Sequence, residues 1–326
     1  MTTRLTVLAT GGTIAGIAGS AIANEYRAGE ISIEDYLEQV VGLGLEAELS
    51  GRQIANIDSA DIGPAVWAPL HAAIGEAMAD EACAGIIVTH GTDTLEETAF
   101  LLDLTLPATK PVVIVGAMRP ADAVGYDGLR NFANAVRVAS DPQAAGRGVL
   151  VVMGDRVFGA RDVRKVRTRG TDAFRGFPRE SVALVTPSTL EWFGAPWRVG
   201  SGAAFGWPGT LPEVAVLYAY AGLDAETTAR GIGPQTRGVV IAGVGEGNLP
   251  DAARQELLRR RRGDGLLVVR ASRADEGLVD REAEDEANGF VAARALNPQK
   301  ARILLQLLIA AGESDPAAIQ RAFDGS

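Results

Sequence analysis

Two stretches of the sequence place hydroxyl and glycine residues directly after a short apolar run. Residues 5–9 lead into TGGTIAG at residues 10–16, and a second apolar run leads into HGTDTLEE at residues 90–97. Adjacent glycines let the backbone come close to a small ligand, and their amide groups can bind an anion or a developing oxyanion. Thr13 therefore lies where catalytic chemistry is usually placed. An ordinary turn in which Thr10 or Thr13 bonds its own backbone has the same pattern.

The second stretch offers a carboxylate as well as hydroxyl groups. Thr94 and Glu97 have the spacing of a capping box, so the polar residues here could serve only to stabilise a helix start. Alternatively, Thr94 caps the helix while Thr92 and Asp93 face a crevice. The hydroxyl would then position water and the carboxylate would bind a cationic amine. The local pattern fits both interpretations.

Three further polar segments could contribute a base or an anion site. Lys165 lies among three arginines in GARDVRKVR at residues 159–167. Burial and neighbouring positive charge lower a lysine pKa and make the amine a better proton acceptor, although a basic surface loop has the same pattern. Ser59 could bind a carboxylate through local amides, or could simply cap the next helix. The glycine-rich residues 243–248 lack the full spacing of a dinucleotide-binding loop.

The composition argues against several kinds of partner. The formal net charge of −10 argues against nucleic acid, because a face that binds nucleic acid must be basic. No apolar segment approaches the roughly 20 residues that cross a membrane, so we expect no membrane partner.

The first predicted strand begins almost at Met1, so we expect a cytoplasmic protein, or a periplasmic one if a leader has been removed. Cys83 is the single cysteine and there are two histidines, so we expect neither an internal disulfide nor a metal site.

The pattern of apolar residues predicts two α/β domains. The chain has 326 residues, 47% of them hydrophobic, and buried strand-like runs alternate with segments of helical periodicity. We expect a larger N-terminal catalytic domain over residues 1–190, a linker over 191–212 and a smaller domain over 213–326, each domain with a mostly parallel sheet flanked by helices. Ligands in such folds bind beyond the carboxyl ends of the strands, where both threonine turns would lie. The predicted strands span residues 5–9, 53–57, 85–89, 111–116, 148–153, 213–218, 238–244 and 265–270. The predicted helices span residues 65–79, 94–104, 128–139, 250–262, 298–311 and 316–323.

Four motifs together point to a known family. They are ATGGTIAG at residues 9–16, THGTDT with EE within 89–97, VGAMRP at 115–120 and LNPQKAR at 296–302. This set resembles the bacterial-type L-asparaginases, the asparaginase/glutaminase family, from about the first predicted strand to the last predicted helix. The resemblance implies hydrolysis of the side-chain amide of L-asparagine to L-aspartate and ammonia, without a metal or an organic cofactor.

The resemblance also implies catalytic roles for individual residues. Thr13 corresponds to the primary nucleophile, and Tyr26 to a lid-loop tyrosine that hydrogen-bonds and activates it. Thr92, Asp93 and Lys165 correspond to a second catalytic group. In this group Lys165 would be the base that activates Thr92 or the attacking water. An acyl-enzyme and a direct attack by water are both compatible with the sequence.

Substrate-binding roles follow from the same resemblance. Asp58 and Ser59 correspond to a loop that binds the α-carboxylate of the substrate, and Asp93 corresponds to the ligand of its α-amine. Amides near Thr13 and Thr92 would stabilise the oxyanion, and the carbonyl of Ala117 would accept a hydrogen bond from the leaving amide.

Two residues of the second domain are implied to act in trans. Asn248 and Glu282 correspond to residues that reach the site of a neighbouring subunit, although Glu284 lies close to Glu282 in the sequence. The resemblance therefore implies an intimate dimer within a homotetramer.

Other functions are compatible with the same residues. A dual glutaminase-asparaginase, or a domain that releases ammonia for a partner enzyme, would use the same machinery. A two-domain amino-acid-binding protein without turnover would use Asp93 and Ser59, and it would need neither Thr13 nor Lys165.

One departure from the family pattern generates a prediction. Many relatives have Gln or Glu next to the carboxylate-binding serine, where this chain has Ala60. Because a polar side chain there would add a contact to the α-amine of the substrate, we expect Ala60→Gln to lower the KM for L-asparagine. Steady-state ammonia release measures this KM, and an unchanged or higher value contradicts the prediction.

Overall fold

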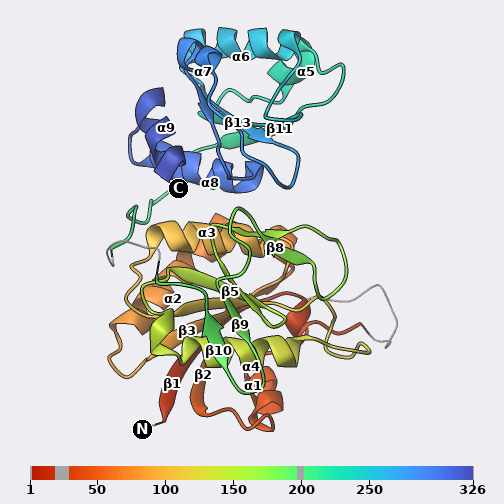
Figure 1. Cartoon of the computed structure of the whole chain (residues 1–326), viewed down its shortest axis with the longest axis vertical. Coiled ribbons are helices and arrows are strands. Elements are labelled where there is room, and N and C mark those ends of the chain that lie inside the picture. The colour runs from red at the N-terminus through yellow and green to blue at the C-terminus, as the bar shows by residue number, and fades with distance from the viewer. Residues whose placement is uncertain (1, 19–28, 197–201, 326) are drawn as a thin grey trace. The chain divides into compact units, whose positions relative to one another are not determined.

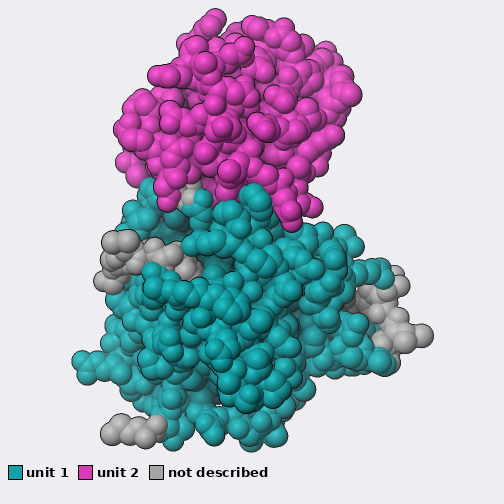
Figure 2. Space-filling model, viewed as in Figure 1, with its two compact units in different colours: residues 1–206 teal, residues 207–326 magenta. Residues whose placement is uncertain are grey.

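The protein consists of two compact α/β units. The computed structural model describes residues 2–18, 29–196 and 202–325. The units comprise residues 1–206 and 207–326, coloured separately in Figure 2. The first contains an eight-stranded sheet and the second a four-stranded sheet. The two-domain α/β fold expected from the sequence is confirmed.

The large sheet of the first unit is parallel over most of its width. Its strands follow the order β10-β9-β6-β5-β4-β3-β1-β2 (Figure 1). All pairings from β5 to β2 are parallel, and β6, β9 and β10 extend the opposite edge in antiparallel fashion. Its strands are β1 (Thr3–Gly11), β2 (Ala47–Ile57), β3 (Gly85–Thr89), β4 (Val112–Val115), β5 (Val149–Met153), β6 (Arg156–Gly159), β9 (Ala183–Val185) and β10 (Leu190–Trp192). A separate antiparallel ribbon joins β7 (Val163–Lys165) to β8 (Phe174–Gly176).

Helices cover both faces of this sheet. They are α1 (Ile33–Val41), α2 (Pro64–Ala79), α3 (Leu95–Thr105) and α4 (Gly128–Ala139). Successive strand residues point to opposite faces. Val7 therefore enters the core formed with α1 and α4, whereas Leu8 enters the core formed with α2 and α3. Every residue of β3, β4 and β5 is buried, which explains their continuous Val, Ile and Leu runs.

The strand order reverses at β1. The chain passes from β1 to β2 on one side, and β3, β4 and β5 then follow on the other side. Open α/β sheets form ligand sites at the carboxyl ends of strands beside such a reversal. Strands β1 and β3 are adjacent, with Ala9 opposite Thr89. The turns that follow these two strands, with Thr13 and Thr92, therefore emerge side by side.

Several elements of the first unit were not predicted from the sequence. Helix α1 and the short strands β6 to β10 were missed. The strands have only three or four residues each and carry little periodicity. Lys165 lies in strand β7 and Arg164 is buried, so the interpretation of residues 159–167 as a basic surface loop is wrong. Glu191 and Trp192, which were assigned to the linker, lie in β10, and the first unit extends to Gly206.

The second unit is a smaller, fully parallel α/β layer. Its strands pair in chain order: β11 (Val214–Tyr218), β12 (Gly238–Gly243), β13 (Leu267–Ser272) and β14 (Phe290–Ala292). Its helices are α5 (Ala225–Arg230), α6 (Asp251–Asp264), α7 (Ala283–Asn288), α8 (Pro298–Ala310) and α9 (Pro316–Gly325). Helices α6 and α8 lie on opposite faces of this sheet (Figure 1). Leu257 of α6 packs against Ile241 and Val268 of the sheet.

The helices of the described residues are short compared with a membrane span. Within residues 2–18, 29–196 and 202–325, none is both long enough and apolar enough to span a lipid bilayer.

Candidate active site

The two threonine turns of the first unit touch each other through their glycines. Gly12 has a φ of 82°, in the region that favours glycine. A Cβ atom added to Gly12 would lie 2.3 Å from both the Cα and the backbone nitrogen of Gly91. This distance is shorter than any real contact, so the close approach of the turns requires a residue without a side chain. The geometry thus brings the segment with Thr13 against the segment with Thr92.

Hydrogen bonds to the neighbouring strands hold the first turn in place. The hydroxyl of Thr10 donates to the carbonyl of Thr89 at 2.9 Å, which links the ends of β1 and β3. The amide of Gly12 donates to the carbonyl of Ile57 at 3.0 Å, at the end of β2. Thr10 therefore bonds an adjacent strand rather than its own backbone. Thr13 begins a short 3-10 helix, Thr13–Ala15, and is only 5% exposed.

An amine and a carboxylate meet at the second threonine. The Nζ atom of Lys165 donates to the Oγ1 atom of Thr92 at 2.8 Å and forms an ion pair with Asp93. The Lys165 side chain is 14% exposed, and that of Asp93 is 60% exposed. In its neutral form, an amine at this distance from a hydroxyl can accept the hydroxyl proton, which is the arrangement of a general base with its nucleophile or bound water.

The Asp58–Ser59 loop closes one side of the second turn. The backbone amide of Asp93 donates to Ser59 Oγ at 3.2 Å, and the hydroxyl of Thr94 donates to the Ser59 carbonyl at 2.7 Å. Ser59 is 3% exposed. A Cβ atom on Gly91 would lie 2.7 Å from Ser59 Oγ, so the loop is also in close contact with the turn. Asp58 accepts from the amide of Ala60 at 2.9 Å and caps the 3-10 helix Ser59–Asp61.

The capping-box interpretation of the second turn is wrong. Thr94 occupies the N-cap position of α3, but its side chain makes no capping bond. Its hydroxyl is instead used to anchor Ser59. The alternative, in which Thr94 caps the helix while Thr92 and Asp93 face a crevice, is wrong in its first part for the same reason. Thr92 contacts Lys165, and its role towards water or substrate stays a prediction.

The turn after β4 supplies Ala117, which is fully buried. The carboxylate of Asp127 accepts hydrogen bonds of 3.0–3.1 Å from the amides of Met118 and Arg119. Asn131 donates to the carbonyl of Gly116 at 2.9 Å. The Ala117 segment is therefore fixed in shape by side chains from the start of α4.

Neither Asp127 nor Asn131 was predicted from the sequence to anchor this segment. Asp127 and Asn131 are spaced by four residues, and the Asn131 side chain donates to Asp127 at 3.0 Å. Asn131 is fully buried in α4, where Phe132, Ala135 and Val138 are also buried. A polar residue at an expected core position, four residues after an acidic one, was the signal available in the sequence.

A chain of hydrogen bonds runs beneath the second turn. His90 is completely buried, and its Nδ1 and Nε2 atoms lie 2.7 Å from the carbonyl of Gly91 and 2.8 Å from the Thr98 hydroxyl. A carbonyl only accepts, so Nδ1 carries the proton and Nε2 accepts from Thr98. Trp67 donates to Thr98 at 2.9 Å. Each donor thus has one acceptor, and the chain fixes the orientation of the Gly91 carbonyl.

Burial also sets the protonation state of this histidine. Loss of solvation lowers the pKa of His90 from 6.5 to about 4, opposed by the hydrogen bond to Gly91. His90 is therefore neutral at physiological pH, as its hydrogen bond from Thr98 requires.

Three of the expected site residues are not among the described residues of the first unit. Tyr26 lies outside the described residues. Asn248 and Glu282 belong to the second unit, where Asn248 closes a tight turn with Val244 and Glu282 is the N-cap of α7. Within the part of the chain that the structure describes, no three His, Cys, Asp or Glu side chains are grouped as metal ligands.

In this two-domain α/β chain the turns of Thr13 and Thr92 are thus in contact, with Lys165 and Asp93 at the second turn. Two family profiles match the chain: "Asparaginase, N-terminal" over residues 4–198 and "Glutaminase/Asparaginase C-terminal domain" over residues 213–323. The chain belongs to the bacterial-type asparaginase/glutaminase family.

Individual relatives support this assignment over nearly the full length. A probable periplasmic L-asparaginase of Haemophilus influenzae is 41% identical, and the match covers 98% of this chain and 92% of that protein. L-asparaginase 2 of Escherichia coli is 39% identical, with the same coverage of 98% and 92%. The crystal structure of a probable cytoplasmic L-asparaginase from Campylobacter jejuni has a TM-score of 0.93 and 37% identity, covering 99% of this chain and 100% of that one.

The buried histidine generates a prediction about stability. Its pKa is about 4 in the folded protein and 6.5 for an unperturbed side chain, so only the unfolded chain gains this proton between the two values. As pH falls from 6.5 towards 4, His90 therefore lowers the free energy of unfolding by up to about 1.4 kcal/mol per pH unit. We expect His90→Gln to show a shallower loss of stability over this range, measured by urea unfolding at several pH values. Parallel curves for the two proteins contradict the prediction.

Proposed function

We propose that this protein is an L-asparaginase that hydrolyses the side-chain amide of L-asparagine to L-aspartate and ammonia. The observation that carries the proposal is the contact of Lys165 Nζ with Thr92 Oγ1 beside the turn that holds Thr13. An amino-acid-binding protein would not need a lysine amine at this threonine. Membership of the asparaginase family, and relatives that carry the name L-asparaginase, give the same substrate.

In the proposed reaction, the two threonine turns face the carboxamide of the substrate from two sides. The Thr13 oxygen, or a water molecule, adds to the carboxamide carbon, and the carbonyl oxygen takes up the negative charge. Backbone amides of the turns around Thr13 and Thr92 stabilise this charge. The C–N bond then breaks, the nitrogen gains a proton and ammonia leaves. If Thr13 is the attacking group, water releases aspartate from the ester in a second step.

Lys165 acts as the general base in the proposed reaction. Its amine accepts a proton from the Thr92 hydroxyl or from a water held there, and the Asp93 carboxylate stabilises the resulting ammonium group. Tyr26 is proposed, from the family resemblance, to activate Thr13.

The proposed anchors of the substrate lie around Ser59. Since Ser59 Oγ accepts from the Asp93 amide, its own hydrogen can be donated to the α-carboxylate of the substrate. Asp58 extends the same loop. The exposed Asp93 carboxylate binds the α-amine, and the carbonyl of Ala117 receives the leaving amide.

A second reaction uses the same arrangement. L-glutamine has the same α-amine, α-carboxylate and amide groups, and one matching family profile carries the name Glutaminase/Asparaginase. We therefore propose asparaginase activity first, and a dual glutaminase-asparaginase as the alternative. A coupled ammonia assay with both amides side by side decides between the two.

We also propose that the protein acts as a homotetramer in which Asn248 and Glu282 reach the site of a neighbouring subunit. Cytoplasmic residence is proposed because the single cysteine, Cys83, is buried and cannot form an internal disulfide, a usage typical of reducing compartments. The relatives themselves include a periplasmic and a cytoplasmic protein by name.

Removal of the catalytic groups tests the reaction. We expect Thr13→Ala to abolish measurable ammonia release from L-asparagine, and Lys165→Met to lower kcat by roughly 100- to 10,000-fold. Lys110→Met is the matched control, because Lys110 lies on the surface and donates to the backbone carbonyl of Asp80. Both active-site variants should still bind L-aspartate in calorimetry. Retention of full activity by Thr13→Ala contradicts the proposed reaction, and substrate binding without turnover by the unchanged protein supports the binding-protein alternative.

The subunit arrangement has a test of its own. We expect light scattering after size exclusion to give the mass of four chains, and dilution that separates the subunits to abolish activity. We also expect Glu282→Ala to raise the KM for L-asparagine, because a substrate contact is lost while the chemical groups stay in place. A fully active single chain contradicts the shared site.

A further inference from the structure

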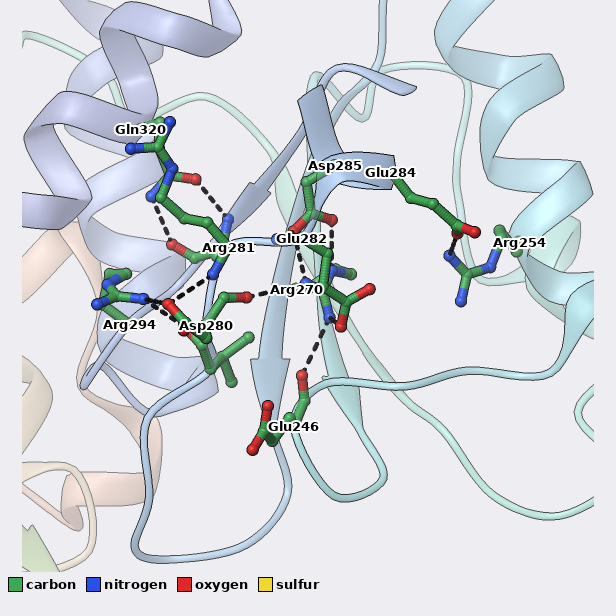
Figure 3. Close-up of polar contacts among 12 residues, drawn as sticks. Glu246, Arg254, Arg270, Asp280, Arg281, Glu282, Glu284, Asp285, Arg294 and Gln320 are labelled. Carbon is green, nitrogen blue, oxygen red and sulfur yellow. Dashed lines mark hydrogen bonds and ion pairs between the residues drawn. The ribbon is translucent and has the colours of Figure 1, made fainter. Parts of the chain in front are cut away.

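A buried cation in the second unit joins the two loops that carry Asn248 and Glu282. Arg270 lies within β13, and its side chain is 1% exposed. A charge removed from water in this way is stable only if it is paired and hydrogen-bonded. Figure 3 shows Arg270 surrounded by acidic side chains and backbone carbonyls. The guanidinium group has five N–H donors, and four of them form hydrogen bonds with described residues.

Two of these donors bind the carboxylate of Asp285. Nε donates to Oδ1 at 2.6 Å and Nη2 donates to Oδ2 at 2.5 Å, which is a bidentate pair (Figure 3). Asp285 also accepts from the backbone amide of Glu282 at 3.0 Å, as part of the capping box that starts α7. Arg270 therefore fixes the backbone at Glu282 through Asp285.

The remaining donors reach two separate segments. Nη1 of Arg270 donates to the carbonyl of Glu246 at 3.0 Å and lies 3.4 Å from Oε1 of Glu282. Nη2 donates to the carbonyl of Asp280 at 3.1 Å. Glu246 lies in the turn of residues 244–248, and the other two residues precede α7. Four of the five N–H groups thus donate hydrogen bonds, Nη1 also forms an ion pair with Glu282, and these contacts join the two segments to one rigid group.

The turn that carries Asn248 is tightly constrained at its other end. Val244 and Asn248 exchange two backbone hydrogen bonds of 2.8 Å. Ser272 of β13 donates to the carbonyl of Gly245 at 2.6 Å. The two ends of the turn are paired with each other, and Ser272 of β13 binds the carbonyl of Gly245. Arg270 binds the carbonyl of Glu246 in the middle of the turn, so the backbone of the turn has little conformational freedom.

We propose that Arg270 is a positioning residue for the reaction, which orients Asn248 and Glu282 together for the site of the neighbouring subunit. This inference rests on the proposed function, in which those two residues serve that site. Arg270 touches no reacting group. Its contribution is to set the relative geometry of two substrate contacts before the substrate arrives, so that no binding free energy is used to order them.

The chemistry of the side chain makes the proposal testable by a conservative change. Lysine keeps the positive charge but has three donors on a single nitrogen, so it cannot hold both oxygens of Asp285 and two carbonyls in a planar arrangement. Arg270→Lys therefore leaves the charge of the buried pair in place and removes the connection between the loops. Asp285→Asn is a second variant, which weakens the same connection from the other side.

The first measurement is steady-state kinetics on the purified tetramer. We expect Arg270→Lys to raise the KM for L-asparagine about tenfold to 100-fold, with kcat changed much less, because loosened substrate contacts weaken binding. Arg260→Lys is the matched control. Arg260 is also a mostly buried arginine of this unit, it pairs with Asp264 and it donates to two carbonyls, of Ile232 and Gly233. The control should keep the original KM.

The second measurement asks in which subunit the defect acts. Chains with Thr13→Ala and chains with Arg270→Lys, carrying different tags, are co-expressed, and tetramers that contain both are isolated. Only the Arg270→Lys chains then provide Thr13. In some sites, the Arg270→Lys chain provides Thr13 and a Thr13→Ala neighbour provides the loops. Those loops are oriented by an intact Arg270. We expect a kinetic component with the original KM, which neither parent tetramer shows.

The outcomes separate this inference from the proposed function. If the mixed tetramer shows only the raised KM of the Arg270→Lys parent, the defect stays within the chain and the positioning role is overturned. The role is also overturned if Glu282→Ala raises KM while Arg270→Lys and Asp285→Asn, both folded by circular dichroism and tetrameric, keep the original value. If Glu282→Ala itself keeps the original KM, the shared site of the proposed function fails, whatever Arg270 does.

Discussion

The candidate active site depends on the absence of two side chains. Gly12 and Gly91 meet backbone to backbone at the point where the strand order of the large sheet reverses. Any Cβ atom there would separate the turns that follow β1 and β3. The convergence of Thr13 and Thr92 is therefore a packing constraint, imposed before any polar contact is considered. Hydrogen bonds to Thr89 and Ile57 then hold the first turn in this position.

The charges of the site are arranged by elements that are remote in sequence. Lys165 lies in the short ribbon of β7 and β8, and it forms an ion pair with Asp93 from the turn after β3. Because the Asp93 side chain is 60% exposed, water screens this ion pair and limits its contribution to stability. The Asp93 carboxylate therefore stays accessible to solvent, whereas the amine of Lys165 is mostly buried. Beneath it, the neutral His90 fixes the Gly91 carbonyl without adding charge.

The two units use polar interactions in different ways. In the first, polar groups hold the turns at the strand ends, as Asp127 does for the segment after β4. In the second, one buried arginine holds two loops together through a bidentate pair with Asp285. Buried ion pairs contribute little net stability compared with apolar packing, so their retention is better explained by the geometry that they impose. Loop geometry is what the proposed site, with residues from two subunits, would need.

The sequence by itself determined the fold class, the family and the central strands and helices. Long buried strands and amphipathic helices carry their own periodicity, and the two threonine motifs are local. Only the tertiary structure decided the use of Thr94, which anchors Ser59 instead of capping its helix, and the strand position of Lys165. It also revealed the anchoring roles of Asp127 and Arg270. These contacts join residues far apart in the chain or on different elements, and hydrogen-bond partners at such separations leave no local pattern in a single sequence.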